Sequence, residues 1–444
     1  MQTSKFSFYN LSFDVEDKHY IYNTLSTALA QLDERTFNAI QKNDVALVDA
    51  ACAEEMLAQH FLVDSQAVEF YEYLYFYNHI RFGRLVNRLS VTFIPTCNCN
   101  LACPYCSQGP NKDNVSIKIE DIDIIFTFIS KTIEDYITTG VKITTIVTDL
   151  FGGEPMLQKR ALIYFSEGFK NIAKKYQCES KFLMTSNMTL LDNDMIELIK
   201  KYQITVQVTI DGTKEQHDKR RVFADGSGTY DIILKNLARL RDAGLKEFVT
   251  IRLNIDKDNI DEAENIFTNI CDFSDDVYFA FIGKYKGYND SFSSQCVHDR
   301  VYPSIATETF NTIYQKYGRP PVRLFGKDSP CAMVSENTFV IDPLLNVYKC
   351  ATLLNRPKYC VGYIDSSGQF IKNAEFYKQM NRTPEIFPVC LACKLLPSCA
   401  GGCAGTVAIN DGTMDKPQCS FSEESLIILL KDYIKKNYGM NNVS

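Results

Sequence analysis

Ten of the sixteen cysteines in this 444-residue chain fall into two groups, and their types and spacing favour metal or redox chemistry. Three of them share one short stretch with CxxxCxxC spacing, namely Cys99, Cys103 and Cys106. The other seven are Cys331, Cys350, Cys390, Cys393, Cys399, Cys403 and Cys419. The N-terminal residues show no secretion-signal pattern. In a long chain without such a signal, clustered thiols are more typical of metal ligands than of disulfides.

The first group supplies three of the ligands that a 4Fe-4S cube needs. Three thiolates hold three irons, and the fourth iron stays open to a small molecule. Such a centre binds a ligand at its open iron and delivers an electron to it. A zinc site is the alternative, but structural zinc takes four ligands. None of the five histidines flanks this stretch, so the iron-sulfur interpretation fits better.

The elements that must position this stretch lie in residues 90–284, where short apolar runs alternate with longer amphipathic ones, as in βα units. The predicted strands are residues 91–95, 144–151, 181–187, 205–211, 248–255 and 277–282. Right-handed crossovers arrange six such parallel strands as a partial barrel or an open sheet. Functional residues then follow the carboxyl ends of the strands, which is where the first cysteine group stands.

The stretch TCNCNLACPYC, residues 96–106, resembles the signature loop of the radical S-adenosylmethionine (SAM) superfamily. The resemblance extends over about residues 88–290. It implies an α/β fold, a partial (β/α)6 barrel, in which the open iron chelates the amino and carboxylate groups of SAM. It also implies that reductive cleavage of SAM gives a 5′-deoxyadenosyl radical, which abstracts hydrogen from a substrate.

Further motifs follow in the order that the family uses. The GGEP sequence at 152–155 is similar to its SAM amino-group motif, and a glycine pair permits close backbone approach. The IDG sequence at 210–212, followed by His217, Asp218 and Arg220, resembles a stretch common in peptide-modifying members. The resemblance implies a SAM site made by Tyr105, Gly152, Gly153, Glu154, Pro155, Ser186, Asn187, Asp211 and Arg252. Plain packing of Tyr105 and an ordinary ion pair at Arg252 are the alternatives.

The second cysteine group contains a CxxCx5CxxxC core and resembles the SPASM domain, which carries two auxiliary 4Fe-4S clusters. Seven thiols are one fewer than two cubes require. Carried over by position, the first auxiliary cluster takes Cys331, Cys350 and Cys403, and the second takes Cys390, Cys393, Cys399 and Cys419. The eighth ligand is Cys296, Cys360, a substrate group or none, and two zinc sites are the alternative. The implied cofactors are therefore SAM and three 4Fe-4S clusters.

Three domains are expected. Residues 1–88 contain a hairpin around an EDKH turn and two short helices, and we interpret them as a winged-helix-like module that recognises a leader peptide. An N-terminal extension packed on the barrel is the alternative. Residues 89–318 form the barrel. Residues 319–444 form the SPASM domain and end in an amphipathic helix, whose LIILL run we interpret as a docking face.

The resemblance implies a maturase that crosslinks a ribosomal precursor peptide, with its leader added at the hairpin edge and a reductant such as flavodoxin or ferredoxin as a second partner. An open auxiliary iron favours a thioether bond. Carbon-carbon crosslinking and anaerobic sulfatase maturation are the alternatives, although sulfatase-maturing members carry an acidic residue where Ala351 stands. A non-enzymatic metal-binding regulator is a more distant alternative. No catalytic acid or base is assigned.

The net charge and the distribution of apolar residues indicate which classes of partner and which cellular location to expect for the protein. The net charge of -7 and the pI near 5.5 argue against a nucleic-acid partner, because nucleic-acid footprints are normally basic. No run of about 18 apolar residues is present to span a membrane. The sequence therefore predicts a cytoplasmic protein with neither a nucleic-acid nor a membrane partner.

Overall fold

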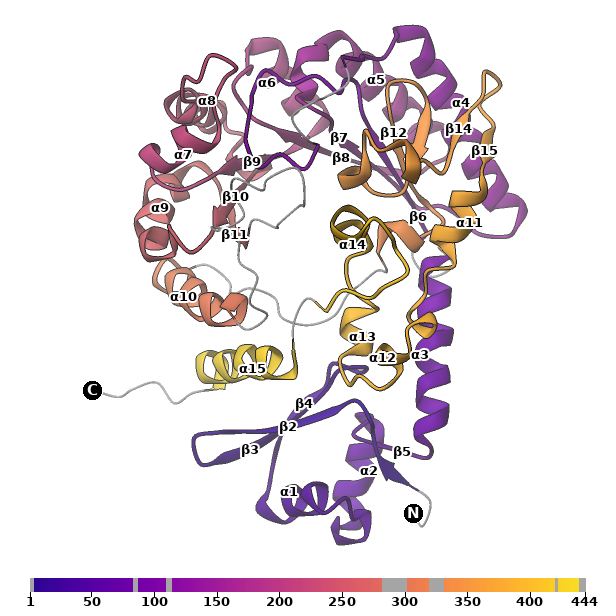
Figure 1. The fold of residues 1–444 in the computed structure, drawn as a ribbon, viewed down its shortest axis with the longest axis vertical. Coiled ribbons are helices and arrows are strands. Elements are labelled where there is room, and N and C mark those ends of the chain that lie inside the picture. Colours follow the sequence, from indigo (N-terminus) through magenta and orange to yellow (C-terminus); the bar gives the residue numbers. More distant parts are fainter. Residues whose placement is uncertain are drawn as a thin grey trace.

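A computed structural model describes residues 4–82, 87–108, 114–281, 302–318, 331–419 and 422–438 (Figure 1). Its described strands form a ten-stranded sheet, a three-stranded sheet and a two-stranded sheet. The ten-stranded sheet runs in the order β11-β10-β9-β8-β7-β6-β12-β13-β14-β15 and holds the candidate site along one rim.

Six parallel strands form the first part of this sheet and follow one another in chain order. They are β6 (Arg88–Phe93), β7 (Thr145–Leu150), β8 (Glu179–Ser186), β9 (Thr205–Ile210), β10 (Val249–Ile255) and β11 (Asp276–Phe281). The six strands predicted from the sequence are thus confirmed, with ends displaced by a few residues; residue 282 lies outside the described residues. The curved sheet of Figure 1 is the α/β fold that the sequence predicts.

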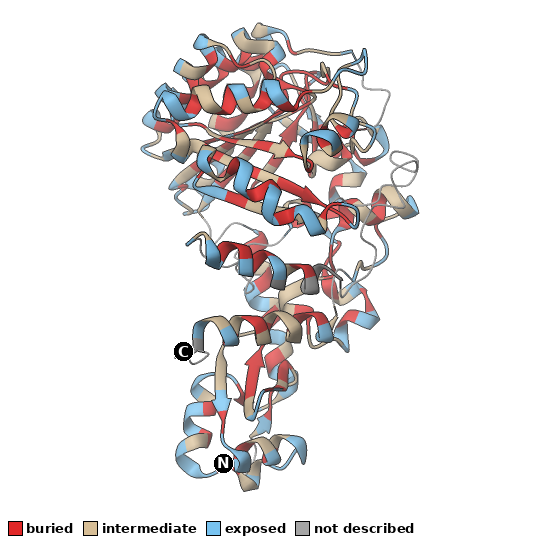
Figure 2. Ribbon diagram, turned by 90° about the vertical axis from the view of Figure 1, so that its left-hand side faces the viewer, coloured by how far each residue is buried: buried red, intermediate tan, exposed pale blue. Residues whose placement is uncertain are grey.

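Helices cover the outer face of the parallel strands. They are α4 (Ile119–Thr138), α5 (Lys159–Lys175), α6 (Asn193–Tyr202), α7 (Lys214–Arg220), α8 (Tyr230–Asp242) and α9 (Ala263–Ile270). Each strand alternates: Phe182 and Met184 are buried toward the helices, whereas Lys181 and Leu183 point to the inner face and are exposed. Buried residues accordingly concentrate between the sheet and the helices (Figure 2).

The C-terminal region continues the same sheet. Strand β12 (Thr338–Ile341) pairs in parallel with β6, and the antiparallel strands β13 (Asn346–Tyr348), β14 (Gly362–Ile364) and β15 (Phe370–Lys372) extend it. The short helices α11 (Ala374–Met380), α12 (Pro388–Leu391), α13 (Leu396–Cys399) and α14 (Ala404–Asp411) follow. This pairing places β12 beside β6, the strand that precedes the first cysteine group.

The N-terminal region contains the predicted hairpin. Strands β2 (Asn10–Val15) and β3 (Lys18–Asn23) pair across a turn, and β4 (Leu29–Leu32) adds a third antiparallel strand. Strand β1 (Lys5–Phe6) pairs with β5 (Leu62–Val63). The two predicted short helices are confirmed as α1 (Glu34–Gln41) and α2 (Ala50–Ala58), and each begins at an aspartate, Asp33 or Asp49, whose carboxylate accepts a backbone N–H of the first turn. The comparison with a winged helix stays a prediction.

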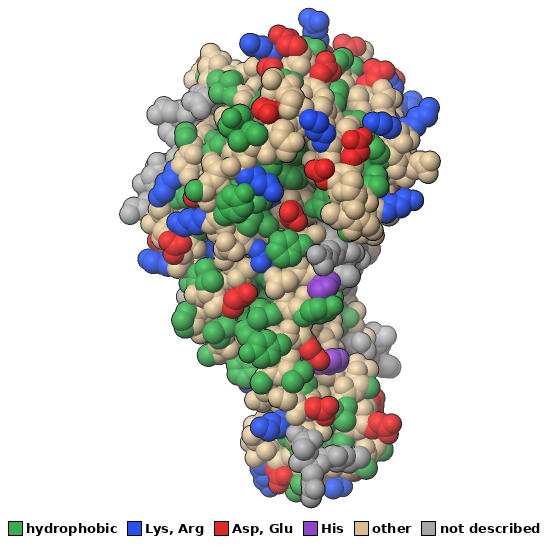
Figure 3. Space-filling model, turned by 90° about the vertical axis from the view of Figure 1, so that its right-hand side faces the viewer, with side chains coloured by type: hydrophobic (Ala, Val, Ile, Leu, Met, Phe, Trp, Pro, Cys, Tyr) green, Lys and Arg blue, Asp and Glu red, His purple; other side chains and the backbone are tan. Residues whose placement is uncertain are grey.

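Helix α3 (Gln66–Arg81) was not predicted from the sequence. It has apolar and aromatic residues on every side, so it shows no clear helical period. On one side Tyr73 and Tyr77 pack against Phe387 and Leu396 of the C-terminal region. On the other side Tyr71 is 68% exposed, and apolar side chains gather on this face of the molecule (Figure 3).

Two helices join the ends of the chain. Helix α15 (Glu423–Tyr438) packs beside α10 (Tyr302–Lys316), and its Leu426 and Leu430 contact Leu11 and Phe13 of the N-terminal sheet (Figure 1). The docking face predicted for the LIILL run is therefore confirmed. Among the described helices, none combines the length and the apolar character needed to cross a membrane.

Candidate active site

The three cysteines of the first group lie on the loop that follows β6, as the sequence predicts. Backbone hydrogen bonds close this loop at its base. The N–H of Cys97 donates to the carbonyl of Val115 over 2.9 Å, and the N–H of Ile117 donates to the carbonyl of Pro95 over 2.9 Å. The loop therefore has a fixed base at the carboxyl end of the first parallel strand.

The three thiols lie near enough to one another to interact electrostatically. The pKa of Cys103 is raised to about 11, mainly by burial; the cation of Arg221 opposes this rise, and Asp211, Cys106 and Cys99 add to it. The N–H of Leu101 donates to the sulfur of Cys99 over 3.4 Å. A metal bound here would displace the thiol protons, since the thiolate is the ligand.

The GGEP segment is bonded directly to this loop. A Cβ on Gly152 would lie 2.3 Å from the carbonyl oxygen of Thr96, and one on Gly153 would lie 2.0 Å from that of Asn98. The N–H of Gly153 donates to Thr96 over 3.1 Å, and the N–H of Glu154 donates to Asn98 over 2.8 Å. The glycine pair therefore lets the end of β7 lie against the cysteine loop, which any side chain would prevent.

Glu154 links the loop to the end of β8. Its carboxylate is fully buried and accepts hydrogen bonds from the hydroxyl of Ser186 (2.9 Å) and the backbone N–H of Asn187 (2.7 Å). Pro155 follows it as the first residue of a short 3-10 helix. The side-chain amide of Asn187 donates to Asn100 over 2.8 Å and faces the sulfur of Cys99 at 3.8 Å. The GGEP segment and the end of β8 are thus parts of one network with the cysteine loop.

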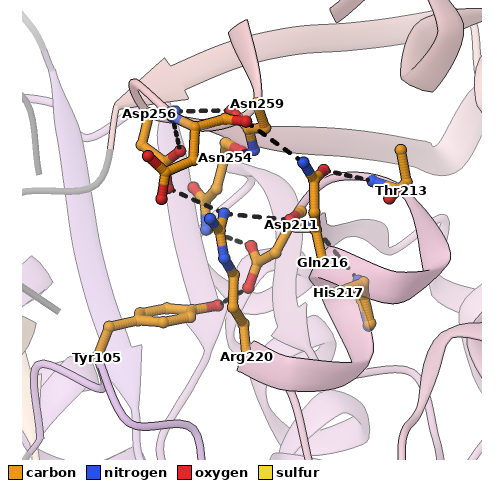
Figure 4. Close-up of polar contacts among 10 residues, drawn as sticks. Tyr105, Asp211, Thr213, Gln216, His217, Arg220, Asn254, Asp256 and Asn259 are labelled. Carbon is orange, nitrogen blue, oxygen red and sulfur yellow. Dashed lines mark hydrogen bonds and ion pairs between the residues drawn. The ribbon is translucent and has the colours of Figure 1, made fainter. Parts of the chain in front are cut away.

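A second network joins Tyr105 to β9 and β10 (Figure 4). The phenol of Tyr105 donates to the carboxylate of Asp211. The amide of Asn254 donates to the other oxygen of that carboxylate over 2.7 Å, and it accepts from Nε of Arg252 over 2.9 Å. Three residues that the sequence placed at the SAM site therefore lie together: Tyr105, Asp211 and Arg252.

Two further residues of the IDG stretch, His217 and Arg220, form hydrogen bonds with the backbone of Asp211 (Figure 4). The N–H of Asp211 donates to Nδ1 of His217 over 3.2 Å, and burial lowers the pKa of His217 to about 4, so this imidazole is neutral. Arg220 donates to the carbonyl of Asp211 over 3.3 Å and forms a buried ion pair with Asp256 over 2.9 Å. Their contacts are structural and hold the turn that presents Asp211.

Arg221 was missed by the sequence interpretation, which chose Arg220. Its Nη1 donates to the hydroxyl of Tyr105 over 3.0 Å, and its charge acts on the thiol of Cys103. The N–H of Ala102 donates to the carbonyl of Val222 over 2.8 Å, which fastens this arginine beside the loop. The sequence shows two adjacent arginines and contains no signal for this long-range contact.

In the second cysteine group, Cys350 and Cys390 interact electrostatically with different thiols. Burial raises the pKa of Cys350, and Cys331 and Cys403 raise it further. A Cβ on Gly405 would lie 3.4 Å from the sulfur of Cys350 and 3.9 Å from that of Cys403. Burial likewise raises the pKa of Cys390 to about 11, and the thiols that add to this effect are Cys399, Cys393 and Cys419.

Of the two cysteines considered as an eighth cluster ligand, the structure describes only Cys360. The thiol of Cys360 donates to the carbonyl of Gly362 over 3.1 Å, and Cys296 lies outside the described residues. Within the described parts of the chain every cysteine is free of disulfide bonds. Those same parts contain no group of three or more His, Cys, Asp or Glu side chains placed to hold a single metal ion.

Comparisons with known proteins agree with this geometry. Residues 93–270 match the family model described as the Radical SAM superfamily. A curated relative, the cysteine-type anaerobic sulfatase-maturating enzyme of Clostridium novyi (strain NT), is 24% identical over 360 residues, which are 74% of this chain and 92% of that protein.

Two solved structures share the fold. The structure of anSMEcpe with bound AdoMet has a TM-score of 0.58 at 17% identity and covers 79% of this chain and 93% of its own. The structure of SuiB from Streptococcus suis bound to S-adenosylmethionine has a TM-score of 0.54 at 14% identity. It covers 94% of this chain and 99% of the SuiB chain. The residues matched by the family model contain the cysteine loop, the GGEP segment and β7 to β10. Residues 93–270 therefore form a radical SAM domain, and the protein that carries it is an enzyme.

Proposed function

We propose that this enzyme is a maturase that modifies a ribosomally made precursor peptide. The observation that carries the proposal is the direct bonding of the three-cysteine loop to the GGEP segment, which would put the cluster and the SAM amino group on one rim of the sheet. The relatives support a peptide substrate: one is a sulfatase-maturating enzyme, and SuiB has been solved bound to the precursor peptide SuiA.

The donor set fits the cofactors. Cys99, Cys103 and Cys106 would hold a 4Fe-4S cluster with one open iron, since they are three thiols on one loop. When bound, the reduced cluster and SAM supply a 5′-deoxyadenosyl radical that takes a hydrogen atom from the peptide. The inner-face residues Arg252 and Asp211 offer opposite charges for the carboxylate and amino or ribose groups of SAM.

The seven thiols of the second group would hold two further clusters, in the groups of three and four described above. The group of three leaves one iron open to a substrate thiolate, which favours a thioether crosslink. Carbon-carbon crosslinking needs no such open iron and is the second candidate. Anaerobic sulfatase maturation is the third, and the curated relatives favour it.

The free edge of β4 fits a leader peptide. The N–H of Asn23 donates to the carbonyl of Ala28 over 2.9 Å, so that pair is hydrogen-bonded. Because such pairs alternate along an antiparallel ladder, the N–H groups of Leu29 and Gln31 point away from β3. No described strand pairs with this outer edge. An added peptide strand would therefore find two free donors there.

Replacing Gln31 by proline is expected to weaken leader binding about three- to tenfold, because it removes one outward donor worth about 1 kcal/mol. Proline is tolerated on an edge strand, so the module should stay folded. Gln31→Ala is the matched control, because it keeps the N–H, and it should bind as the parent does. Binding of a labelled leader, measured by fluorescence anisotropy, checks both. Equal affinity for the proline and alanine variants would exclude this edge.

Replacing Arg221 by glutamine is expected to make the first cluster harder to reduce. Reduction adds negative charge beside Cys103, and the nearby guanidinium stabilises that charge. A tenfold change in the reduction equilibrium corresponds to about 59 mV for one electron, and we expect a lowering of that order. An EPR-monitored redox titration measures it. Arg221→Lys keeps the charge and should restore most of the potential; equal potentials for the glutamine variant and the parent would contradict this role.

The experiment that tests the whole proposal is metal analysis followed by turnover of the anaerobically reconstituted protein. About twelve irons per chain, 5′-deoxyadenosine formation and a peptide lighter by about two mass units are expected for a crosslink. A gain of oxygen with loss of sulfur at a cysteine would indicate formylglycine instead. If the protein binds zinc in place of iron and does not cleave SAM, the alternative of a non-enzymatic metal-binding regulator would be favoured.

A further inference from the structure

The inner face of the parallel strands carries a row of side chains below the candidate SAM-binding rim. Leu150 and Thr148 are buried toward the helices, so Asp149 between them points to the inner face. In the strand register Asp149 lies opposite Thr92 on β6 and Leu183 on β8. Paired residues share a face, and these three side chains therefore form one row inside the curved sheet.

Asp149 is an unpaired carboxylate in this row. Its Oδ1 atom is shielded from solvent and has no hydrogen-bond partner among the described residues. Burial alone raises the pKa of Asp149 to about 6. The charged side chains on the inner face of the adjoining strands are Arg88, Glu179 and Lys181, all nearer the amino ends of the strands; Lys181 lies 3.5 Å from Glu179.

Solvent reaches the side chain that lies beside Asp149 on β8. Leu183, its register partner, is 42% exposed although it lies on the concave side of the sheet. Asp149 is three residues before Gly152, which places it roughly 10 Å along the strand from the GGEP segment. A carboxylate oxygen that is shielded from solvent and unpaired is costly to a fold, and groups of this kind concentrate where chemistry needs them. The row therefore offers a proton acceptor beside the exposed side chain of Leu183.

We propose that Asp149 accepts the proton that the peptide releases during crosslinking, an inference that rests on the proposed function. Thioether formation removes two hydrogens from the peptide. One leaves the C–H bond as a hydrogen atom and is taken by the 5′-deoxyadenosyl radical. The other leaves the thiol as a proton and goes to the Asp149 carboxylate, the S–C bond forms, and the remaining electron passes to an auxiliary 4Fe-4S cluster.

The test compares Asp149→Asn with the parent holoenzyme, using SAM, a reductant and the peptide encoded by the short reading frame beside the gene. Both 5′-deoxyadenosine and crosslinked peptide are measured in the same reaction. The variant should cleave SAM within about twofold of the parent and should form at least tenfold less crosslink per deoxyadenosine, since a general base contributes about 100-fold or more. Asp194→Asn, which removes an exposed carboxylate from α6, should change neither quantity.

The pH profile separates a base from a structural residue. The parent should lose crosslinking as the pH falls through about 6, because protonation removes the base. Asp149→Asn should lack this acidic limb of the pH profile, whereas Asp149→Glu should keep it. If the asparagine variant does not fold, the glutamate variant still tests the proposal. An unchanged yield and profile in both variants would overturn the proposal. Absence of SAM cleavage by the parent enzyme would instead overturn the proposed function.

Discussion

Alanine in place of Cys99, Cys103 or Cys106 is expected to abolish SAM cleavage. Each thiol would hold one iron, and a cube with two protein ligands is not retained in a site that also needs a free iron for SAM. The expected loss is at least 100-fold in 5′-deoxyadenosine, which chromatography of the anaerobic reaction measures. The iron content should fall by about four per chain, because only this cluster is lost.

Cys178→Ala is the matched control for this series. The Cys178 thiol donates to the carbonyl of Ile143 over 3.3 Å, at the amino end of β8 and away from the cysteine loop. This variant should keep the parent iron content and the parent rate. Full SAM cleavage in any one of the three loop variants would contradict the cluster assignment and, with it, the proposed chemistry.

Much of the barrel could be predicted from the sequence because its signals are local. Strand β8 alternates buried and exposed residues, and α5 repeats its apolar residues with a helical period. The order of the motifs placed the cysteine loop after β6 and the GGEP segment after β7, where the structure has them. These features depend on neighbours within about ten residues, so a single sequence contains them.

The features that were missed depend on distant partners. Helix α3 shows no helical period in its sequence, because one face packs against the N-terminal and C-terminal regions while aromatic residues such as Tyr71 also occupy its exposed face. The pairing of β12 with β6 joins residues about 250 positions apart, since Val340 lies opposite Thr92. Sequence spacing contains neither relation.

The same reason explains the choice between the two adjacent arginines. Arg220 and Arg221 differ in role only because α7 ends there and the chain turns toward the cysteine loop, where Leu101 and Phe223 form a bridge. One side chain then faces Asp256, and the other faces Tyr105. A motif position is therefore assigned to a role only when the structure shows which way its side chain points.

Replacing Cys403 by alanine is expected to separate SAM cleavage from product formation. Cys403 and Cys350 both lie beside Gly405, so the variant would lose one auxiliary cluster and about four irons while the first cluster stays intact. Deoxyadenosine should still form, at a rate reduced by no more than about tenfold, and crosslinked peptide should be undetectable, because the electron acceptor is gone. Mass spectrometry of the peptide and deoxyadenosine analysis of one sample measure both.

The same variant should also be less stable. The proposed ligands Cys331, Cys350 and Cys403 come from separate segments, so metal binding contributes directly to the folding of the C-terminal region, and its loss lowers the melting temperature of the holoenzyme. Cys52→Ala, in the N-terminal helix α2, is the matched control and should keep iron, product and melting temperature. Parent levels of crosslinked peptide in Cys403→Ala would show that this thiol holds no cluster on which the reaction depends.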